Sequence, residues 1–333
     1  MATTLPPYYH PTTVCFIDDN FSFLNSLSLD LPDDWPFISY LDPEIALAAV
    51  NQPDLLSPLV DRCFSMDNSD PGEPLIHLNL GALEQEIKLV HRFRRLSVLM
   101  VDYAMPNMSG LEFCERVENP DLKKVLLTGV ADEKTAVAAF NKGIIDHYVP
   151  KHSLKTVYEL IPFVEKLKRS YFDQYSARLT SNLALNPPAF MSEPAIASYF
   201  EKILRKFNIV EYYLASDPYG YLLLRADGSM VRLVVLCQDE LDQQTLLAQQ
   251  YDAPPRLVRR MQAGKLIGYF YEHPEDYMGH EVYPWREALI AAKRIEGKQI
   301  WYVGVAKNPP VDVDFDASES SYEQFLRLER PVV

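Results

Sequence analysis

The sequence has no apolar run long enough to cross a membrane and no internal repeat. Its first residues lack the basic and apolar segments of a secretory signal peptide, so we expect a cytoplasmic protein. The four cysteines (Cys15, Cys63, Cys114 and Cys237) are scattered, and no pair has the spacing of a metal site. The spacing offers no metal motif, and reduced thiols in the core are expected.

Positive charge is also scarce, since 32 Lys and Arg residues face 46 Asp and Glu residues, for a net charge of −14. From Thr180 to Val333 there are 16 Lys and Arg residues against 21 Asp and Glu residues, a local balance of −5. The basic clusters, such as Arg256, Arg259 and Arg260, fit solvated helix faces, and we recognise no helix-turn-helix pair. Because nucleic-acid binding depends on neutralising phosphates, it is not expected here.

Hydrophobic residues make up 48% of the chain, which excludes global disorder, and 333 residues suffice for two domains. Four apolar runs, over residues 14–17, 98–101, 125–127 and 146–150, read as buried strands. The residues that follow them are Asp18 and Asp19, then Asp102, then Thr128, then Lys151. Apolar runs separated by helical stretches predict a parallel sheet, whose sites lie beyond the carboxyl ends of its strands. We therefore expect three carboxylates, a hydroxyl and an ammonium to meet at one edge.

This set of groups suits phosphoryl chemistry with a divalent cation. Crowded carboxylates repel one another, and Mg²⁺ relieves the repulsion by taking oxygen ligands. A carboxylate can attack phosphorus and form an aspartyl-phosphate, while the metal and Lys151 place positive charge around the transferring group. Thr128 can donate a hydrogen bond to the new oxygens. A single Asp at a strand end is usually a turn or a helix cap, so the ordered set carries the prediction.

On these residues, the chain from about Thr12 to Glu165 resembles the receiver domain of two-component response regulators. It matches the family's acidic pair, phosphorylated aspartate, following loop, switch hydroxyl, rotating aromatic and signature lysine. In this sequence the matching residues are Asp18 and Asp19, then Asp102, then Met105, Pro106 and Gly110, then Thr128 with Gly129, then Tyr148, and finally Lys151. The resemblance implies an α/β domain with a five-stranded, parallel, doubly wound sheet of the flavodoxin-like type.

The resemblance also implies a mechanism. Mg²⁺ would be held by Asp19, Asp102 and the backbone carbonyl of Ala104, with Asp18 helping through water. A sensor histidine kinase or phosphotransfer protein would phosphorylate Asp102, assisted by Lys151 and Thr128, and Thr128 and Tyr148 would then shift as switch residues. The domain would catalyse only its own phosphorylation and dephosphorylation. We expect the phosphorylated protein to form a homodimer or to bind a partner through its second domain.

Two departures from the family pattern stand out. The family usually has a proline directly after the lysine, whereas here Pro150 precedes Lys151 and His152 follows it. In addition, 83 positions separate Asp19 from Asp102, where roughly 40 are needed. We place an insertion at about residues 52–95, ending in a helix over 83–95. The basic end of that helix, residues 91–95, fits either a helix C-terminus or a contact surface for another protein or domain.

The rest of the chain predicts a second domain. We expect a receiver at 1–165, a helical linker at 166–207, an α+β output domain at 208–310 and an acidic tail at 311–333. A helix over 153–185, kinked or restarted at Pro162, would either form a dimer or pack on the output domain. The output domain is predicted as a mainly antiparallel sheet with strands at 209–215, 219–225, 230–236, 265–271 and 299–306. Helices are expected at 239–251, 254–263 and 285–295.

Three functions compete on these observations. The first is a phosphorylation-controlled switch whose non-DNA-binding output domain signals through dimerisation or protein contact. The second is a small-molecule sensor or enzyme gated by the receiver, and the third is a DNA-binding regulator. An aromatic, acidic loop with His273, His280 and Glu281 fits either a ligand site or an ordinary surface loop.

Overall fold

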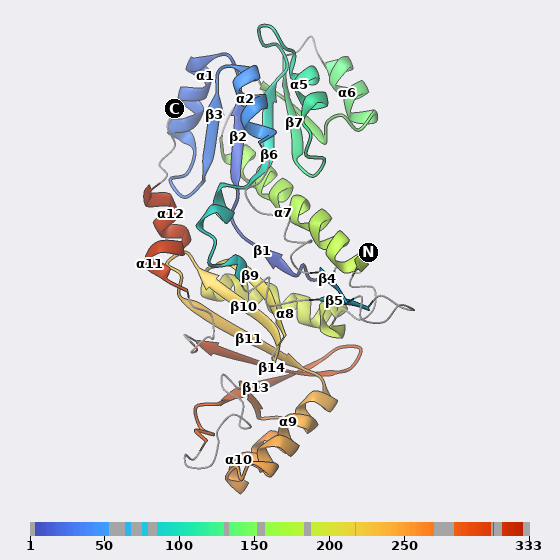
Figure 1. Cartoon of the computed structure of the whole chain (residues 1–333), viewed down its shortest axis with the longest axis vertical. Helices are drawn as coiled ribbons and strands as arrows, with labels where there is room; N and C mark the ends of the chain where they lie inside the picture. Colours follow the sequence, from blue (N-terminus) through green and yellow to red (C-terminus); the bar gives the residue numbers. More distant parts are fainter. Residues whose placement is uncertain are drawn as a thin grey trace. The chain divides into compact units, whose positions relative to one another are not determined.

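The computed structural model describes residues 4–52, 64–67, 75–78, 85–129, 133–151, 157–182, 188–216, 218–269, 283–307, 309 and 315–328. The chain divides into two compact units (Figure 1). We call the first the parallel-sheet unit; it comprises Pro11–Pro58, His91–Arg178 and Phe325–Val333. We call the second the antiparallel-sheet unit; it comprises Met1–His10, Leu59–Val90 and Leu179–Gln324.

The parallel-sheet unit is built on a five-stranded sheet. In chain order its strands are β2 (Thr13–Ile17), β3 (Phe37–Tyr40), β6 (Leu96–Asp102), β7 (Lys123–Thr128) and β8 (His147–Pro150). Their order across the sheet is β3-β2-β6-β7-β8, and every neighbouring pair is parallel. The central strands β2 and β6 are mostly apolar and almost entirely buried because helices cover both faces, which confirms the predicted doubly wound, flavodoxin-like sheet.

Helices cover this sheet on both sides (Figure 1). They are α1 (Phe21–Asp30), α2 (Pro43–Val50), α5 (Gly110–Arg116), α6 (Glu133–Asn141) and α7 (Val157–Asn182). Side chains of α1 and α7 pack into one core with β2, β6 and β7, while α2, α5 and α6 contact strands from the other face. Asn20, Asp42 and Ser109 cap the first three of these helices by accepting backbone N–H groups.

The long helix α7 continues through Pro162, so the restart considered as one alternative at this residue does not occur. Its buried Leu160, Val164 and Leu167 belong to the core that α1 also faces. Packing of this apolar stripe therefore outweighs the cost of a proline inside the helix. The ends expected for this helix, at 153 and 185, lie outside the described residues.

One polar cluster fastens α7 to the start of β3. The Glu165 carboxylate accepts a hydrogen bond from the Trp35 indole N–H at 2.6 Å and from the Lys168 ammonium at 2.9 Å. The Lys168 Nζ also lies 4.4 Å from the centre of the Trp35 ring. Burial lowers the pKa of Lys168, and the charge of Glu165 offsets only part of that effect.

The antiparallel-sheet unit is built on a seven-stranded sheet with the order β1-β9-β10-β11-β14-β13-β12. In chain order its strands are β1 (Tyr8–Tyr9), β9 (Ile209–Ser216), β10 (Tyr219–Arg225), β11 (Met230–Leu236), β12 (Leu266–Gly268), β13 (Leu289–Glu296) and β14 (Ile300–Lys307). Every pair is antiparallel, as predicted for the second domain. Two further strands, β4 (Phe64–Asp67) and β5 (Leu75–Leu78), form a separate pair within the long gap after α2.

The prediction of a helix over 285–295 is wrong, because most of this segment is strand β13. Trp285 begins a turn, and β13 pairs with both β12 and β14. The helix-favouring residues Ala291 and Ala292 are overridden by pairing on both sides. The helix predicted over 83–95 also differs, since a 3₁₀ helix, η1 (Val90–Arg94), precedes β6 and residues 79–84 lie outside the description.

The remaining helices belong mainly to the antiparallel-sheet unit. They are the 3₁₀ helix η4 (Ala189–Ser192) and the α-helices α8 (Pro194–Phe207), α9 (Gln238–Gln250), α10 (Pro255–Gln262), α11 (Ala317–Ser320) and α12 (Tyr322–Leu328). The N-cap of α8 is Glu193, a buried carboxylate that accepts the Lys298 backbone N–H at 2.9 Å and the Trp301 indole N–H at 3.4 Å. Glu193 thereby joins the start of α8 to the β13–β14 hairpin.

α9 and α10 pack against each other across the short connection at 251–254. Val258 and Met261 are the buried residues of α10, whereas Arg256, Arg259 and Arg260 are exposed. The three arginines therefore project from the solvent side of the second helix of a pair.

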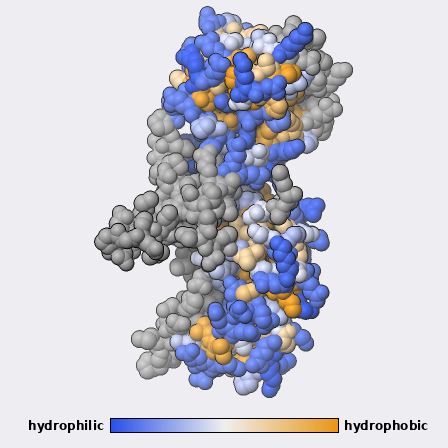
Figure 2. Space-filling model, turned by 90° about the vertical axis from the view of Figure 1, so that its right-hand side faces the viewer, coloured by the Kyte–Doolittle hydropathy of each residue, from blue (hydrophilic) through white to orange (hydrophobic). Residues whose placement is uncertain are grey.

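The surface mixes hydrophilic and hydrophobic residues, as the space-filling view shows for one side of the molecule (Figure 2). Exposed apolar side chains in the parallel-sheet unit include Phe21, Leu29 and Ile45. Among the helices that the structure describes, none is both long enough and apolar enough to span a bilayer.

Candidate functional site

Four strands of the parallel sheet end at the same edge, and each brings a polar residue there. Asp18 and Asp19 follow β2, Asp102 is the last residue of β6, Thr128 is the last residue of β7, and Lys151 follows β8. The strand order reverses between β2 and β6: β3 is added on one side of β2, and β6, β7 and β8 are added on the other. In open α/β sheets, ligands bind at this kind of switch point.

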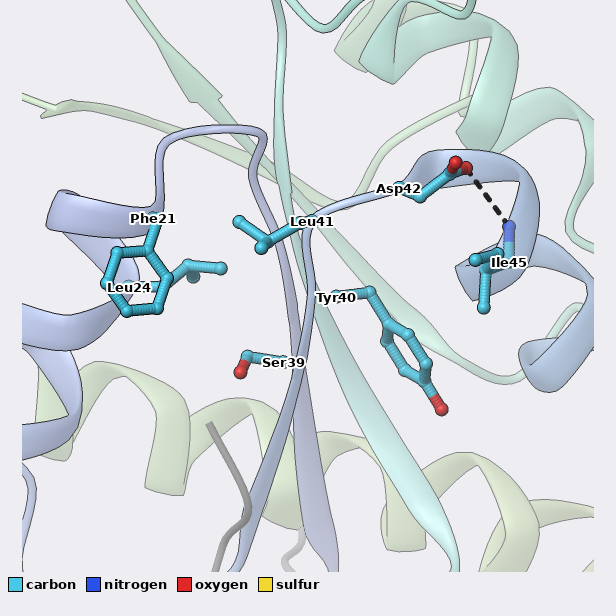
Figure 3. Close-up of a pocket in the computed structure, with 7 residues that line it drawn as sticks. All are labelled: Phe21, Leu24, Ser39, Tyr40, Leu41, Asp42 and Ile45. Carbon is cyan, nitrogen blue, oxygen red and sulfur yellow. Dashed lines mark hydrogen bonds between the residues drawn. The ribbon is translucent and has the colours of Figure 1, made fainter.

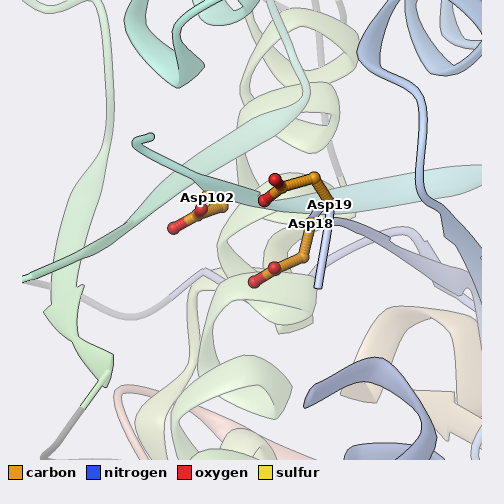
Figure 4. A group of neighbouring side chains, drawn as sticks. All are labelled: Asp18, Asp19 and Asp102. Atoms are coloured by element: carbon orange, nitrogen blue, oxygen red, sulfur yellow. The ribbon is translucent and has the colours of Figure 1, made fainter. Parts of the chain in front are cut away.

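The three carboxylates form one compact acidic group (Figure 4). Asp18, Asp19 and Asp102 each offer an oxygen, and these oxygens lie within 4.8 Å of one another. Asp18 and Asp102 are buried, whereas Asp19 is exposed. Hard oxygen donors at this spacing fit Mg²⁺, which prefers carboxylates and retains several waters. Ala104 lies in the exposed part of the loop that follows Asp102.

The Lys151 ammonium bridges two of these carboxylates. Its Nζ lies 2.7 Å from an Asp18 oxygen and 2.8 Å from an Asp102 oxygen. Burial lowers the pKa of Lys151, but the hydrogen bonds and charges of the two carboxylates outweigh burial and leave the pKa raised. Burial raises the pKa of Asp18, and its bonds to Lys151 and to the Asn20 N–H oppose part of the rise. The lysine is therefore a fixed positive charge beside Asp102.

Thr128 is buried at the end of β7, with 1% of its surface exposed. Its hydroxyl has no hydrogen-bond partner among the described residues. A buried hydroxyl without a partner is costly, so a group arriving at this edge would gain a donor that is already desolvated. Tyr148 lies on β8 opposite Leu126, two positions before Thr128 on β7, and is half-buried.

The loop after Asp102 depends on a glycine. The backbone N–H of Gly110 donates to the carbonyl of Tyr103 at 2.9 Å, and α5 begins at Gly110. A Cβ at this position would collide with the backbone carbonyl of Asp102. Glycine thus lets the start of α5 approach the end of β6 and fixes the course of the loop.

Sequence reasoning missed Phe23. The centre of its ring lies 5.0 Å from the Lys151 Nζ, and the side chain is half-buried against the core formed by α1 and α7. The sequence did contain a signal for this contact. Phe23 lies in the first turn of the helix that directly follows Asp18 and Asp19, and a side chain in that turn can lie close to the strand ends.

A mostly apolar hollow lies between α1 and the β3–α2 connection (Figure 3). Its lining residues are Phe21, Leu24, Ser39, Tyr40, Leu41, Asp42 and Ile45. None of these residues is predicted to act in phosphoryl transfer, and the Asp42 carboxylate is occupied in capping α2. The residues His273, His280 and Glu281, considered above as a possible ligand loop, lie outside the described residues.

Comparisons with known proteins agree with this geometry. Residues 80–160 match the family model described as the response regulator receiver domain, a range that includes Asp102, Thr128 and Lys151. The structure of the Legionella pneumophila response regulator LqsR superposes with a TM-score of 0.78 at 29% sequence identity. That match covers 98% of this chain and 97% of LqsR.

A shorter likeness links the chain to a curated relative. Over 59 residues it is 41% identical to the cyclic di-GMP phosphodiesterase response regulator RpfG of Xanthomonas campestris pv. campestris (strain 8004). The match spans 16% of this chain and only 16% of RpfG. With the parallel sheet and the acidic edge, these matches show that the chain contains a response regulator receiver domain, and over nearly its whole length the chain is similar in structure to the response regulator LqsR.

Proposed function

We propose that the protein is a cytoplasmic switch in which Asp102 accepts a phosphoryl group from a histidine kinase or phosphotransfer protein. The observation that carries this proposal is the Lys151 ammonium held against Asp18 and Asp102 at the switch point of the sheet. An Asp102 oxygen forms the new bond to phosphorus, and the bond between phosphorus and the donor's nitrogen breaks. The Lys151 ammonium then donates a hydrogen bond to a phosphoryl oxygen and neutralises part of the charge on that group.

The other residues have supporting roles. Mg²⁺, when bound by Asp19, Asp102 and the Ala104 carbonyl, supplies positive charge to the phosphoryl oxygens. Asp18 keeps Lys151 in place and completes the acidic group. The Thr128 hydroxyl, which has no partner among the described residues, donates a hydrogen bond to a phosphoryl oxygen, and the shift of Thr128 makes room for Tyr148 to turn inward.

Phosphorylation adds roughly −1.5 to −2 charges at this edge, which is enough to reorganise the surrounding loops. We propose that the new surface promotes homodimerisation or protein contact through the second domain. The division that we propose along the chain is a receiver at 1–165 with its insertion, a helical linker at 166–207, an output domain at 208–310 and an acidic tail at 311–333. Within these ranges, Met1–His10 and Leu59–Val90 belong to the antiparallel-sheet unit and Phe325–Val333 to the parallel-sheet unit.

Asp102→Asn tests the assignment. Wild-type protein with acetyl phosphate and Mg²⁺ should gain one phosphoryl mass and grow in light scattering, whereas Asp102→Asn should do neither and keep its circular dichroism spectrum. Asp33→Asn is a matched control, since Asp33 is an exposed carboxylate in the turn between α1 and β3. The control should behave as wild type. A phosphoryl group found on another residue of Asp102→Asn would refute the assignment.

A second candidate function, DNA binding by the antiparallel-sheet unit, is favoured by the α9–α10 pair. The exposed Arg256, Arg259 and Arg260 of α10 are suited to DNA phosphates. The net charge of −14 opposes this function. A mobility shift of mixed DNA that weakens with salt, and that is reduced in an Arg259→Ala, Arg260→Ala variant, would establish it. No shift at low salt would discard it.

A further inference from the structure

Four contacts around the acidic group form a closed circuit. An Asp18 oxygen accepts the Asn20 backbone N–H at 3.0 Å, and the Asn20 side chain accepts the Phe23 backbone N–H at 3.1 Å. The Phe23 ring lies 5.0 Å from the Lys151 Nζ, which returns to Asp18 at 2.7 Å. The ammonium is thereby connected to the first turn of α1 from two directions.

The Phe23 ring supplies a weakly directional attraction for the Lys151 ammonium, in addition to the bonds from the two carboxylates. Asp18 and Asp102 fix the ammonium from the sheet side, but the Lys151 side chain is still 29% exposed. The face of an aromatic ring carries partial negative charge and attracts a cation within about 6 Å of its centre. This attraction has little directional demand, so the ammonium can shift towards a phosphoryl oxygen while it stays over the ring.

Phe23 is itself held in place. Its backbone N–H is fixed by the Asn20 cap, and its side chain packs against the core that contains Leu24 and Leu27. Because both the backbone and the side chain of Phe23 are already held, the ring loses little conformational entropy when it contacts the ammonium. Phe21, two residues earlier on the same helix, is 55% exposed and provides a natural comparison.

We propose that Phe23 is a positioning residue, whose ring face holds the Lys151 ammonium at the phosphoryl-accepting edge and connects it to α1. The proposal rests on the proposed function, because it assigns Phe23 a part in the reaction at Asp102. Phe23 touches neither phosphorus nor the attacking oxygen, and it acts through the lysine.

The first test measures the contact without any phosphorylation. In protein labelled at lysine Cε, the Lys151 signal is assigned by its loss in Lys151→Arg. We expect the ring current of Phe23 to shift this signal upfield in wild type, Phe23→Tyr and Phe21→Leu, and the shift to disappear in Phe23→Leu. Because Leu keeps the apolar packing, an unchanged signal in a folded Phe23→Leu would overturn the contact.

The second test measures the rate of phosphoryl uptake from acetyl phosphate. Phe23→Leu should slow uptake by about two- to fivefold, while Phe23→Tyr and Phe21→Leu should keep the wild-type rate. Replacing Phe23 by phenylalanines with one, two and three ring fluorines should lower the logarithm of the rate in even steps, since fluorine removes charge from the ring face.

The outcomes separate the two proposals. Equal rates along the fluorine series, or equal losses in Phe23→Tyr and Phe23→Leu, would mean that the ring only packs, and would overturn the positioning role. Absence of uptake by wild-type protein would refute the proposed function and with it the role of Phe23 in that reaction. In that case the lysine signal would still show whether the ring holds the ammonium.

Discussion

The two sheets of this protein distribute their strand ends differently. In the parallel-sheet unit every strand runs the same way, so β2, β6, β7 and β8 deliver Asp18, Asp102, Thr128 and Lys151 to one edge. In the antiparallel-sheet unit neighbouring strands run in opposite directions, and successive strand ends fall at opposite edges. The order of residues along the chain therefore predicts a site in the first unit but not in the second.

Two sets of buried charges illustrate the same division. In the parallel-sheet unit, Asp18 and Asp102 converge on the ammonium of Lys151. In the antiparallel-sheet unit, Glu193 accepts the Lys298 N–H, and Arg232 donates to the Leu233 and Pro218 carbonyls. Convergent side chains leave capacity for an added ion or phosphoryl group, whereas charges bonded to backbone groups fasten one element to another.

The largest effect that we expect comes from Gly110→Ala in the parallel-sheet unit. The added methyl group would collide with the Asp102 backbone carbonyl and push α5 away from β6. We expect a loss of about 3 kcal/mol in the free energy of unfolding, measured with urea. Phosphoryl uptake should fall about 100-fold or more, because the collision displaces the acceptor itself.

Gly220→Ala is the counterpart in the antiparallel-sheet unit. Its Cβ would collide with the Leu233 carbonyl on the neighbouring strand, and its φ of 154° is unfavourable for other residues. We expect a similar loss of about 3 kcal/mol, but normal uptake by the protein that remains folded. If folded Gly220→Ala lost uptake as Gly110→Ala does, the contrast between a site-bearing sheet and a structural sheet would be broken.

The same contrast explains how much could be predicted from the sequence. The central strands β2, β6 and β7 were predictable because their apolar runs are almost entirely buried and lead into a polar residue, as at Asp102 and Thr128, whereas the edge strands β3 and β8 are only partly buried. The Phe23 contact was not, since it depends on where a half-buried ring of α1 lies relative to Lys151. The sequence pattern predicts where the strands end, but it does not predict which side chains from the helices contact the residues at those ends.

In the antiparallel-sheet unit, pairing between segments that are far apart in the sequence determines which residues form strands, and local sequence patterns do not reveal it. The two residues of β1 show no periodicity, yet Tyr8 pairs with Tyr213 more than two hundred positions later. Strand β13 contains alanines, lysine and arginine that favour helix, and it becomes a strand because β12 and β14 flank it. Local propensity fails where the partner strand is far away along the chain.

The smallest effect on stability that we expect comes from Lys168→Met, which tests a comparison between two lysines of the parallel-sheet unit. Lys151 faces two carboxylates, which raise its pKa, whereas Lys168 is almost fully buried with Glu165 and Trp35, and its pKa is lowered. Lys168→Met keeps the apolar stem and removes the charge, so at pH 7 the free energy of unfolding should change by about 1 kcal/mol or less.

The pH dependence of Lys168→Met distinguishes it from an ordinary surface change. Since the folded pKa of Lys168 lies below the unfolded value of 10.5, the unfolded chain binds more protons between these two values. Wild type should therefore gain stability relative to Lys168→Met as the pH rises through this window, and lose the gain as the pH falls through the folded pKa. Other groups titrate in both proteins and cancel in the difference.

Urea unfolding at several values between pH 7 and pH 10 measures this difference, with Lys166→Met, an exposed position on the same helix, as the matched control. The charge of Asp34 also favours the cationic form of Lys168. A stability difference that stayed flat over this range would mean that Glu165, Trp35 and Asp34 together stabilise the Lys168 cation as fully as water does. Uptake at Asp102 should be equal in wild type and Lys168→Met, because this lysine fastens α7 and contributes no charge to the acidic edge. A loss of uptake would instead make both lysines part of one site, and the separation between a reactive cation and a structural one would fail.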